Sequence, residues 1–280
     1  MLIIKQPSAI SEEIKRLRNN GKRIGFFPTM GALHEGHLSL LEESKKTCDI
    51  HACSIFVNPT QFNNPDDLMN YPRTPEKDLG ILEKAGCDIV FMPEVNDLYA
   101  LEKPFQIDIN DLASRYEGAS RPGHFQGVCR VVKLLFDAIG PDDAFFGLKD
   151  FQQCMVIQAL VDQLHLPVAL HFVPTLREPD GLAMSSRNLR LNKEEREEAS
   201  AIYKALSQVK ASFGKKPMGL ILEEARASIE QHNHLQIDYL EIAESRTLKP
   251  FRENSTQSEP VVLAAIYAGD VRLIDNLLLK

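Results

Sequence analysis

Two histidines, His34 and His37, stand where a glycine-containing turn leads into an expected helix. The apolar residues 24–27 predict a buried strand, and the amphipathic residues from 36 to 46 predict a helix. A helix N-terminus offers backbone N–H groups and roughly half a positive charge to an anion, and glycine lets the backbone approach that anion closely. The segment therefore predicts an anion site in which two imidazoles grip phosphate oxygens.

Other interpretations of this segment stay open. A zinc site needs more ligands than two histidines, and the H-E-x-x-H spacing is absent. Gly31 and Gly36 have the spacing of a Walker A loop, but His37 and Leu38 replace the lysine and the hydroxyl residue of that loop. The G-x-G-x-x-G motif of dinucleotide-binding sites is absent. A plain surface loop that happens to carry two histidines would give the same sequence pattern as the anion site.

Polar residues after other apolar runs could complete such a site. Gln61 and Lys149 each follow a short apolar run. A lysine beside phosphates stabilises the charge that develops on a leaving group, although Lys149 could equally form a structural pair with Asp150. A glutamine can hold hydroxyl and carboxylate groups without adding charge, but a lone glutamine such as Gln61 or Gln153 is most often a surface residue.

Ser185, Ser186 and Arg187 form a further candidate cluster. Two hydroxyls beside an arginine fork suit the oxygens of a triphosphate, whereas an N-cap followed by a turn would use the same residue types. No Ser-His-Asp or reactive-cysteine arrangement stands out, and the five cysteines show no C-x-x-C spacing. We therefore expect reduced thiols that fill the core, and a group transfer that needs no protein nucleophile.

The composition indicates a globular chain that does not bind nucleic acids or membrane surfaces. Hydrophobic residues make up 44% and charged residues 25% of the 280 positions, and the formal net charge is −7. Such a chain lacks the basic face that contact with nucleic acids or anionic membranes requires. The sequence starts without a secretory-signal pattern, and no apolar segment approaches the roughly 18 residues of a membrane span. We expect a cytoplasmic protein that binds small anions in a locally positive cleft.

Apolar runs and helical stripes alternate through the first two thirds of the chain. After a short N-terminal strand, we expect strands at residues 24–27, 51–57, 89–91, 144–146 and 168–173, and helices at residues 11–19, 36–46, 75–86 and 125–139. This alternation favours a parallel sheet with covering helices, whose ligands bind beyond the carboxyl ends of the strands. Residues 63–69 are expected to form turns, and residues 99–123 show no clear element.

A change of composition at residues 174–192 marks the expected domain boundary. We expect residues 1–174 to form an α/β domain and residues 175–280 to form a smaller α+β domain. In the smaller domain, Asn192 should cap a charged helix, and residues 218–230 should form another. Strands are expected at residues 237–242, 261–267 and 271–278, the last two joined as a hairpin.

Five ordered motifs resemble those of the pantoate–β-alanine ligase family, part of the H-x-G-H nucleotidylyl-transferase group. They are PTMGALHEGH at 28–37, FVNPTQF at 56–62, YPRT at 71–74, GLKDFQQ at 147–153 and MSSR at 184–187. The resemblance covers residues 1 to 190, and the last third matches in its helix-plus-strand character. It implies a Rossmann-like, doubly wound parallel sheet in the first domain, a second domain that acts as a lid, and a homodimer formed through the first domain.

The resemblance also implies the site residues. ATP would contact Met30, Gly31, Ala32, Leu33, His34, Glu35, Gly36, His37, Gly147, Leu148, Lys149, Asp150, Leu176, Met184, Ser185, Ser186 and Arg187. His37 has the role of the catalytic acid in this family, and His34 and Lys149 would assist it. The substrates pantoate and β-alanine would be held by Gln61 and Gln153, with secondary roles for Asn58, Arg121 and His124. Mg²⁺ would accompany ATP, and Asp78 would lie near the metal and the phosphates.

Three positions depart from the family's pattern. Leu148 stands where an acidic or polar residue is common, Arg130 replaces a usual threonine, and Lys133-Leu134 reverses the usual order. The helix that follows Phe125 is therefore expected to pack somewhat differently, while every residue with an implied catalytic role is present.

The reaction implied by the resemblance has two steps. The pantoate carboxylate attacks the α-phosphorus of ATP and expels pyrophosphate, and the β-alanine amine then attacks the acyl adenylate and expels AMP. Two alternatives remain: an adenylylating nucleotidyltransferase of the same superfamily, and a nucleotide-binding sensor without catalysis. Gln61 and Gln153 favour the ligase, because a phosphate acceptor would call for more cationic residues. A relative of the aminoacyl-tRNA synthetases is disfavoured by the lack of a basic RNA-binding extension.

Overall fold

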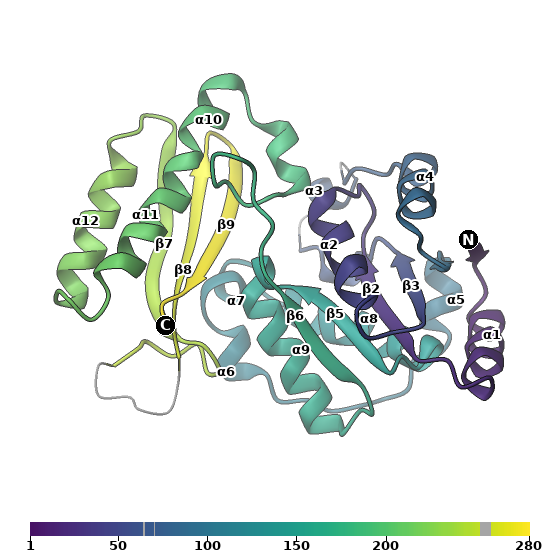
Figure 1. Cartoon of the computed structure of the whole chain (residues 1–280). Coiled ribbons are helices and arrows are strands. Elements are labelled where there is room, and N and C mark those ends of the chain that lie inside the picture. The colour runs from purple at the N-terminus through teal and green to yellow at the C-terminus, as the bar shows by residue number, and fades with distance from the viewer. Residues whose placement is uncertain (64, 70, 253–258) are drawn as a thin grey trace. The chain divides into compact units, whose positions relative to one another are not determined.

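The structure is a computed structural model that describes residues 1–63, 65–69, 71–252 and 259–280. The chain divides into two compact units (Figure 1). The first unit comprises Met1–Leu148 and Val156–Pro174, and the second comprises Lys149–Met155 and Thr175–Lys280. Each unit has its own β-sheet.

A parallel sheet of six strands forms the centre of the first unit. In spatial order its strands are β1 (Leu2–Ile4), β4 (Ile89–Phe91), β3 (Ile50–Ile55), β2 (Ile24–Thr29), β5 (Asp143–Gly147) and β6 (Ala169–Val173). Every pair of neighbouring strands runs parallel. After the edge strand β1, the chain enters the middle of the sheet at β2 and winds through β3 and β4 toward that edge. It then returns to the middle at β5 and continues to β6 on the other side, which confirms the predicted doubly wound, Rossmann-like sheet.

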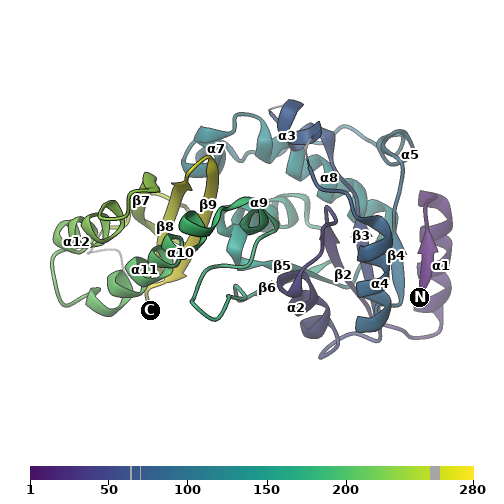
Figure 2. The same ribbon diagram turned by 90° about the horizontal axis from the view of Figure 1, so that it is seen from above.

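Helices cover both faces of this sheet. The helices of the first unit are α1 (Pro7–Asn19), α2 (Glu35–Ser44), α3 (Pro65–Met69), α4 (Pro75–Ala85), α5 (Val95–Tyr99), α6 (Asn110–Ala113), α7 (Tyr116–Ser120), α8 (His124–Ile139) and α9 (Phe151–Leu164), the last shared with the second unit. Neighbouring strand residues point to opposite faces. Phe27 therefore joins a core with apolar residues of α2 and α4, whereas the ring centroid of Phe26 lies 6.3 Å from that of Phe136 in α8. Figure 2 shows α2 and α4 on one side of the sheet and α8 on the other.

Several helix boundaries differ from the sequence prediction. Helix α1 begins at Pro7 rather than at residue 11, because proline is well suited to the first position of a helix. Residues 65–69, expected as turns, form α3, and the stretch 99–123 contains α6 and α7. Helices of four or five residues are too short to show a periodic apolar pattern, so the sequence did not reveal them.

Residues of the expected types mark several helix ends, among them the predicted cap Asn192. Gly86 and Gly140 adopt left-handed conformations at the ends of α4 and α8, where glycine has no steric penalty. Asn192 forms a capping box with Glu195. Thr74 occupies the N-cap position of α4, but its side chain makes no capping bond.

The second unit is built on an antiparallel sheet in the order β7 (Leu235–Glu244), β8 (Pro260–Ala268) and β9 (Val271–Leu278). Ala268 pairs with Val271 around a two-residue turn, which confirms the predicted hairpin. Helices α11 (Ser200–Ser212) and α12 (Met218–Glu230) share an apolar core with this sheet, and α10 (Lys193–Glu198) precedes them. In the part of the chain that the structure describes, no helix is both long enough and apolar enough to cross a membrane.

Candidate active site

The buried carboxylate of Asp78 holds the loop that follows β2. Gly31 and Ala32 have φ angles of 82° and 50°, so the backbone turns through the left-handed region before α2. Ala32 N donates to Asp78 Oδ2 at 2.9 Å and Leu33 N donates to Asp78 Oδ1 at 2.8 Å. The Thr74 hydroxyl donates to the same carboxylate at 3.2 Å. Asp78, which is 1% exposed, therefore fixes the conformation of the loop.

These bonds give Asp78 a structural task that the sequence did not predict. Both of its oxygens already accept protein donors, whereas a magnesium ligand must direct an oxygen to the metal. Among the described residues, no group of three His, Cys, Asp or Glu side chains is placed to hold a metal ion. The donor set in this loop thus does not fit a metal site built by the protein, and a role of Asp78 toward Mg²⁺ stays a prediction.

His34 and His37 cap the start of α2 with their own ring nitrogens. Gly36 N donates to His34 Nδ1 at 3.1 Å, and His34 N donates to His37 Nδ1 at 3.3 Å. This is the geometry of a capping box built from two histidines, whose ring centroids lie 4.0 Å apart. Because each Nδ1 accepts a backbone N–H, the proton of each neutral ring is carried by Nε2.

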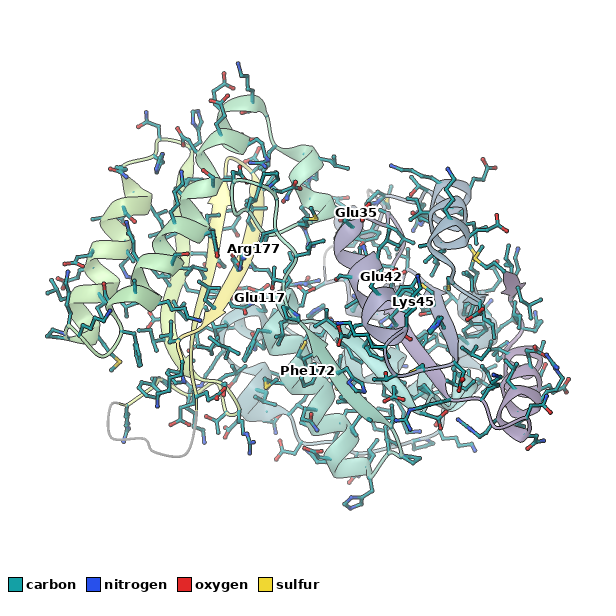
Figure 3. All side chains as sticks on the ribbon, in the orientation of Figure 1. Glu35, Glu42, Lys45, Glu117, Phe172 and Arg177 are labelled. Carbon is teal, nitrogen blue, oxygen red and sulfur yellow. The ribbon has the colours of Figure 1, made fainter. Side chains whose placement is uncertain are left out.

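The capping bonds correct one expectation about the anion site. The sequence predicted that backbone N–H groups at the start of α2 would face the ligand, but those of His34 and Gly36 are used by the histidine rings, and that of His37 bonds His34 O at 2.8 Å. The cap makes the imidazole Nε2–H groups the donors suited to an anion. Figure 3 shows Glu35 at this end of α2, with Glu42 and Lys45 farther along the helix.

A network of buried polar side chains lies after β3. The short 3₁₀ helix η1 (Pro59–Gln61) follows Asn58, and Asn58 and Gln61 are only 1% and 7% exposed. Asn58 Nδ2 donates to Gln61 Oε1 and to Gly127 O, both at 3.1 Å. Gln61 Nε2 lies 3.1 Å from Met30 Sδ, so the glutamine reaches the loop that precedes α2.

Arg121 and His124 join this network from the start of α8. The Nδ1 atom of His124 lies 2.8 Å from Gln61 O, a carbonyl that can only accept, so Nδ1 carries a proton. Arg121 Nη1 lies 3.3 Å from His124 Nε2, which must accept from the guanidinium because the guanidinium has no acceptor. The first unit thus brings together Asn58, Gln61, Arg121 and His124, which the resemblance implies as substrate residues, and that role stays a prediction.

Gly127 allows this approach of α8 to η1, a role that the sequence did not reveal. A Cβ atom at Gly127 would lie 2.3 Å from Thr60 O and 2.8 Å from Gln61 N. Such contacts with backbone atoms would force the helix away from the network. A glycine within an otherwise strongly helical run, at residues 125–139, was the available signal.

The second unit holds another part of the predicted site around Lys149. After Gly147, the 3₁₀ helix η2 (Leu148–Asp150) leads into α9, which carries Gln153 in its first turn. The Nζ atom of Lys149 lies 3.7 Å from Asp150 Oδ1, and its side chain is 17% exposed. Asn276 in β9 donates from Nδ2 to Lys149 O at 3.0 Å, which fixes the backbone that presents the lysine.

The other predicted nucleotide residues of the second unit share one hairpin-like segment. Met184 N donates to Leu176 O at 3.0 Å, and Arg177 and Ala183 form an isolated antiparallel bridge. Ser185 caps the 3₁₀ helix η3 (Ser186–Arg190), because its Oγ accepts from Arg187 N at 3.2 Å. Leu176 and the segment from Met184 to Arg187 are therefore brought together, as predicted, and the N-cap interpretation of Ser185 also holds.

An ion pair between Arg177 and Asp275 anchors this segment, and the sequence did not predict it. Arg177 donates from Nη1 to Asp275 Oδ2 at 2.7 Å and from Nη2 to Oδ1 at 2.9 Å, with side-chain exposures of 15% and 4%. The guanidinium also lies 4.0 Å from the ring centroid of Tyr203. Figure 3 shows Arg177 beside the sheet of the second unit. The available signal was Asp275, a carboxylate inside an apolar strand sequence.

The cysteines offer no activated nucleophile. All five thiols are free. Burial raises the pKa of Cys87 and of Cys129 to about 12, and burial raises the pKa of Cys53 and Cys154 well above the ordinary range. Burial likewise raises the pKa of Cys48. These thiols stay protonated near neutral pH, so they do not supply the thiolate that covalent catalysis requires.

The sequence matches known proteins over its whole length. The sequence profile of the pantoate-beta-alanine ligase family matches residues 2–278. A pantothenate synthetase of a Sulfurihydrogenibium species is 45% identical over 280 residues, covering 99% of each chain. A pantothenate synthetase of Porphyromonas gingivalis is 42% identical over 277 residues, again covering 99% of each chain.

Solved structures agree with the sequence matches. The crystal structure of pantothenate synthetase from Thermus thermophilus is 36% identical, covers 100% of both chains and has a TM-score of 0.92. The pantoate-beta-alanine ligase from Francisella tularensis, complexed with beta-gamma ATP and beta-alanine, is 34% identical, with a TM-score of 0.81 and coverage of 100% of this chain and 98% of that one. On this evidence the chain belongs to the pantoate–β-alanine ligase family.

Proposed function

We propose that this chain condenses pantoate with β-alanine at the expense of ATP, through an enzyme-bound pantoyl adenylate. A carboxylate is a poor acylating agent, and joining it to AMP as a mixed anhydride supplies a good leaving group. The observation that supports the proposal best is the histidine cap of α2, where both Nδ1 atoms accept backbone N–H groups. Two Nε2–H donors at the carboxyl end of a parallel strand suit the oxygens of a triphosphate.

The first step joins two anions that repel each other. A pantoate carboxylate oxygen attacks the α-phosphorus, a P–O bond to the β-phosphate breaks, and pyrophosphate leaves with the bonding electrons. We assign His37 and His34 to the developing negative charge, together with Lys149 and Arg187, because fixed donors and cations lower the barrier most where charge develops. Local positive charge of this kind is compatible with the net charge of −7.

The second step consumes the adenylate. The β-alanine amine attacks the acyl carbon, the C–O bond to AMP breaks, and the amine loses a proton as the amide forms. No protein nucleophile is needed, which agrees with five protonated thiols. Gln61 and Gln153 are assigned to pantoate, with Asn58, Arg121 and His124 in support, since neutral amides hold hydroxyl and carboxylate groups without adding charge.

The nucleotide is assigned to the segments already described. In the first unit these are the residues from Met30 to His37 together with Gly147 and Leu148. In the second unit they are Lys149, Asp150, Leu176 and the residues from Met184 to Arg187. Mg²⁺ enters with the nucleotide, because phosphate oxygens and waters supply most ligands of this ion in such sites. We assign no residue to the metal, since the oxygens of Asp78 already hold the loop.

Residues 175–280 are assigned the role of a lid over the nucleotide, hinged within residues 174–192. A lid excludes water, which would otherwise hydrolyse the adenylate. Crystals grown with and without ATP test this role. We expect a different angle between residues 1–174 and residues 175–280 in the two forms, and identical angles would contradict a lid.

A homodimer formed through the first unit, in the cytoplasm, completes the proposal. Residues 102–109 have neither helical nor strand structure, and a cavity of about 700 Å³ lies between this segment and α8. A segment without regular structure beside a cavity gives a second copy a place to pack. Sedimentation equilibrium should therefore give twice the monomer mass of 31.5 kDa, and a monomer at micromolar concentration would contradict the dimer.

The formation of AMP tests the proposed reaction against its two alternatives. The enzyme is incubated with Mg²⁺, ATP and pantoate, with and without β-alanine. We expect at most one AMP per active site without β-alanine and continuous turnover with it. A nucleotidyltransferase would ignore β-alanine, and a sensor would form no AMP under either condition.

A further inference from the structure

Tyr99, the last residue of α5, contacts the substrate network, although nothing in the sequence singled it out. Its hydroxyl donates to Asn58 Oδ1 at 2.7 Å and lies 2.8 Å from Thr60 Oγ1. Burial raises the pKa of Tyr99, so the phenol keeps its proton and remains a donor near neutral pH. The hydroxyl therefore acts on Asn58 rather than on a ligand.

The bonds around Asn58 determine which end of its amide faces Gln61. Its Nδ2 must face Gly127 O, because a carbonyl oxygen can only accept. Its Oδ1 must face Thr60 N, at 3.3 Å, because a backbone N–H can only donate. Tyr99 adds the shortest bond to this same oxygen, and thus stabilises the orientation in which Nδ2 points to Gln61.

Asn58 in turn determines which end of Gln61 is presented. Asn58 Nδ2 donates to Gln61 Oε1, so the accepting end of the glutamine is occupied by the protein. The other end, Nε2, faces Met30 Sδ at 3.1 Å. A thioether sulfur is a weak acceptor, so an oxygen of a ligand readily takes its place. Gln61 therefore meets its ligand as a donor.

We propose that Tyr99 is a positioning residue that, through Asn58, holds Gln61 with its Nε2–H groups toward an acceptor oxygen of pantoate. The proposal rests on the assignment of pantoate to Gln61 made above. It adds a residue and a direction to that assignment, because it specifies that pantoate must accept at this position. Because Tyr99 acts through Asn58 and Gln61, we expect it to affect the binding of pantoate rather than the chemical step.

The ring of Tyr99 is itself held from behind by α8. The guanidinium of Arg130 lies 5.3 Å from the ring centroid and donates to Glu102 through Nε and Nη2, both at 2.8 Å. Helices α5 and α8 are in contact within the first unit. The Arg130 guanidinium, which Glu102 fixes in place, therefore supports the ring of Tyr99.

The substitution Tyr99→Phe tests the proposal, because it removes the hydroxyl and keeps the ring. We expect KM for pantoate to rise about five-fold, the effect of one neutral hydrogen bond. The turnover number and KM for ATP should stay within two-fold of wild type. Tyr267→Phe, on the exposed surface of the second unit, is the matched control and should change none of these values.

Two further variants keep the test informative. Thr60→Val removes the second hydroxyl that bonds Asn58 Oδ1 and keeps the Thr60 N–H, so it should also raise KM for pantoate. This variant takes the place of Tyr99→Phe in the test if Tyr99→Phe fails to fold. Arg130→Thr removes the support of the ring and should raise KM for pantoate about two-fold, since cation–π contacts at exposed sites are weak.

Three results would count against the idea. An unchanged KM for pantoate in Tyr99→Phe would overturn it. Equal effects on both substrates together with a lower melting temperature would mean a purely structural role, and would overturn it as well. If the wild-type enzyme forms no AMP from ATP, pantoate and β-alanine together, the proposed function fails instead, and this outcome is seen before any variant is compared.

Discussion

Each of the histidines His34 and His37 uses one ring nitrogen to build the start of α2 and carries its proton on the other. The sequence predicted the pair and its place between a strand and a helix, while its use toward phosphate stays a prediction. It could not predict that Nδ1 of each ring caps the helix, because residue types and spacing say nothing of which nitrogen accepts. That detail converts a general anion site into two directed Nε2–H donors.

Replacing His37 separates the capping role from the catalytic one. We expect His37→Ala to lose at least 100-fold in turnover, on the order of 3 kcal/mol of transition-state stabilisation. His37→Asn offers a short side-chain acceptor to His34 N but lacks the Nε2–H donor, so it should lose as much turnover with a smaller effect on melting temperature. His232→Ala is the control in the second unit. Wild-type turnover in His37→Asn would contradict the role given to Nε2.

Asp78→Asn tests whether this carboxylate serves the loop or the metal. The new NH₂ group cannot accept, so Ala32 N or Leu33 N loses its partner in a buried place. We expect the free energy of unfolding to fall by about 1–3 kcal/mol and KM for ATP to rise. The Mg²⁺ concentration at half-maximal rate should stay the same. Normal stability with a higher Mg²⁺ requirement would show that Asp78 acts on the metal.

At the scale of elements, the sequence predicted the long strands and helices but not the short ones. Strands β2 to β6 and helices such as α8 and α12 follow clear apolar patterns, and Gly123 and Gly140 mark the two ends of α8. The short helices α3, α6 and α7 carry too few positions for such a pattern. The contacts of Tyr99 and Arg177 link elements that lie far apart in sequence, so local patterns could not reveal them either.

The segment that carries Leu176 and Arg187 should depend on the Arg177–Asp275 pair. A lysine at position 177 keeps the charge but cannot form both bonds of the arginine fork. We expect Arg177→Lys to raise KM for ATP on the order of 10-fold, equivalent to about 1.4 kcal/mol, with a smaller effect on KM for pantoate. The exposed Arg246→Lys serves as the control. Equal KM values for ATP in the two variants would contradict the anchoring role.

Asp143 links three strands at the amino end of the parallel sheet. Arg23, the residue before β2, donates from Nε to Asp143 Oδ2 at 2.5 Å and from Nη2 to Asp143 Oδ1 at 2.9 Å. The Nε2 atom of His171 in β6 lies 2.7 Å from Asp143 Oδ1. Burial opposes the charge of Asp143, but the hydrogen bonds of Arg23 and His171 outweigh it and hold the pKa of Asp143 below its usual value. A carboxylate of this kind stabilises the fold at pH values above about 4 and loses that effect as the pH falls further.

Asp143→Asn should therefore be less stable than wild type by about 1–3 kcal/mol at pH 6. The difference should stay constant down to about pH 4 and shrink below it, because the carboxylate then takes up a proton more readily in the unfolded chain than in the folded one. Urea unfolding between pH 3 and pH 7 measures both proteins. A difference that does not change with pH over this range would contradict the lowered pKa.

At the scale of the whole molecule, the sequence predicted the doubly wound sheet, the smaller antiparallel sheet and the family. Five motifs in a fixed order carried the family resemblance, and the comparisons confirm it. The division of site residues between the units was not apparent from the sequence. Lys149 and Gln153 belong to the second unit although they precede residue 174, because Asn276 in β9 holds the backbone of Lys149.

The central claim is that pantoate is activated as an acyl adenylate, and labelled oxygen tests it most directly. Pantoate carrying ¹⁸O in its carboxylate is converted with ATP and β-alanine, and the products are weighed by mass spectrometry. If the carboxylate attacks the α-phosphorus, one ¹⁸O must leave with AMP when the amide forms. We predict one labelled oxygen in AMP and none in pyrophosphate. Unlabelled AMP, or label in an inorganic phosphate product, would contradict the account.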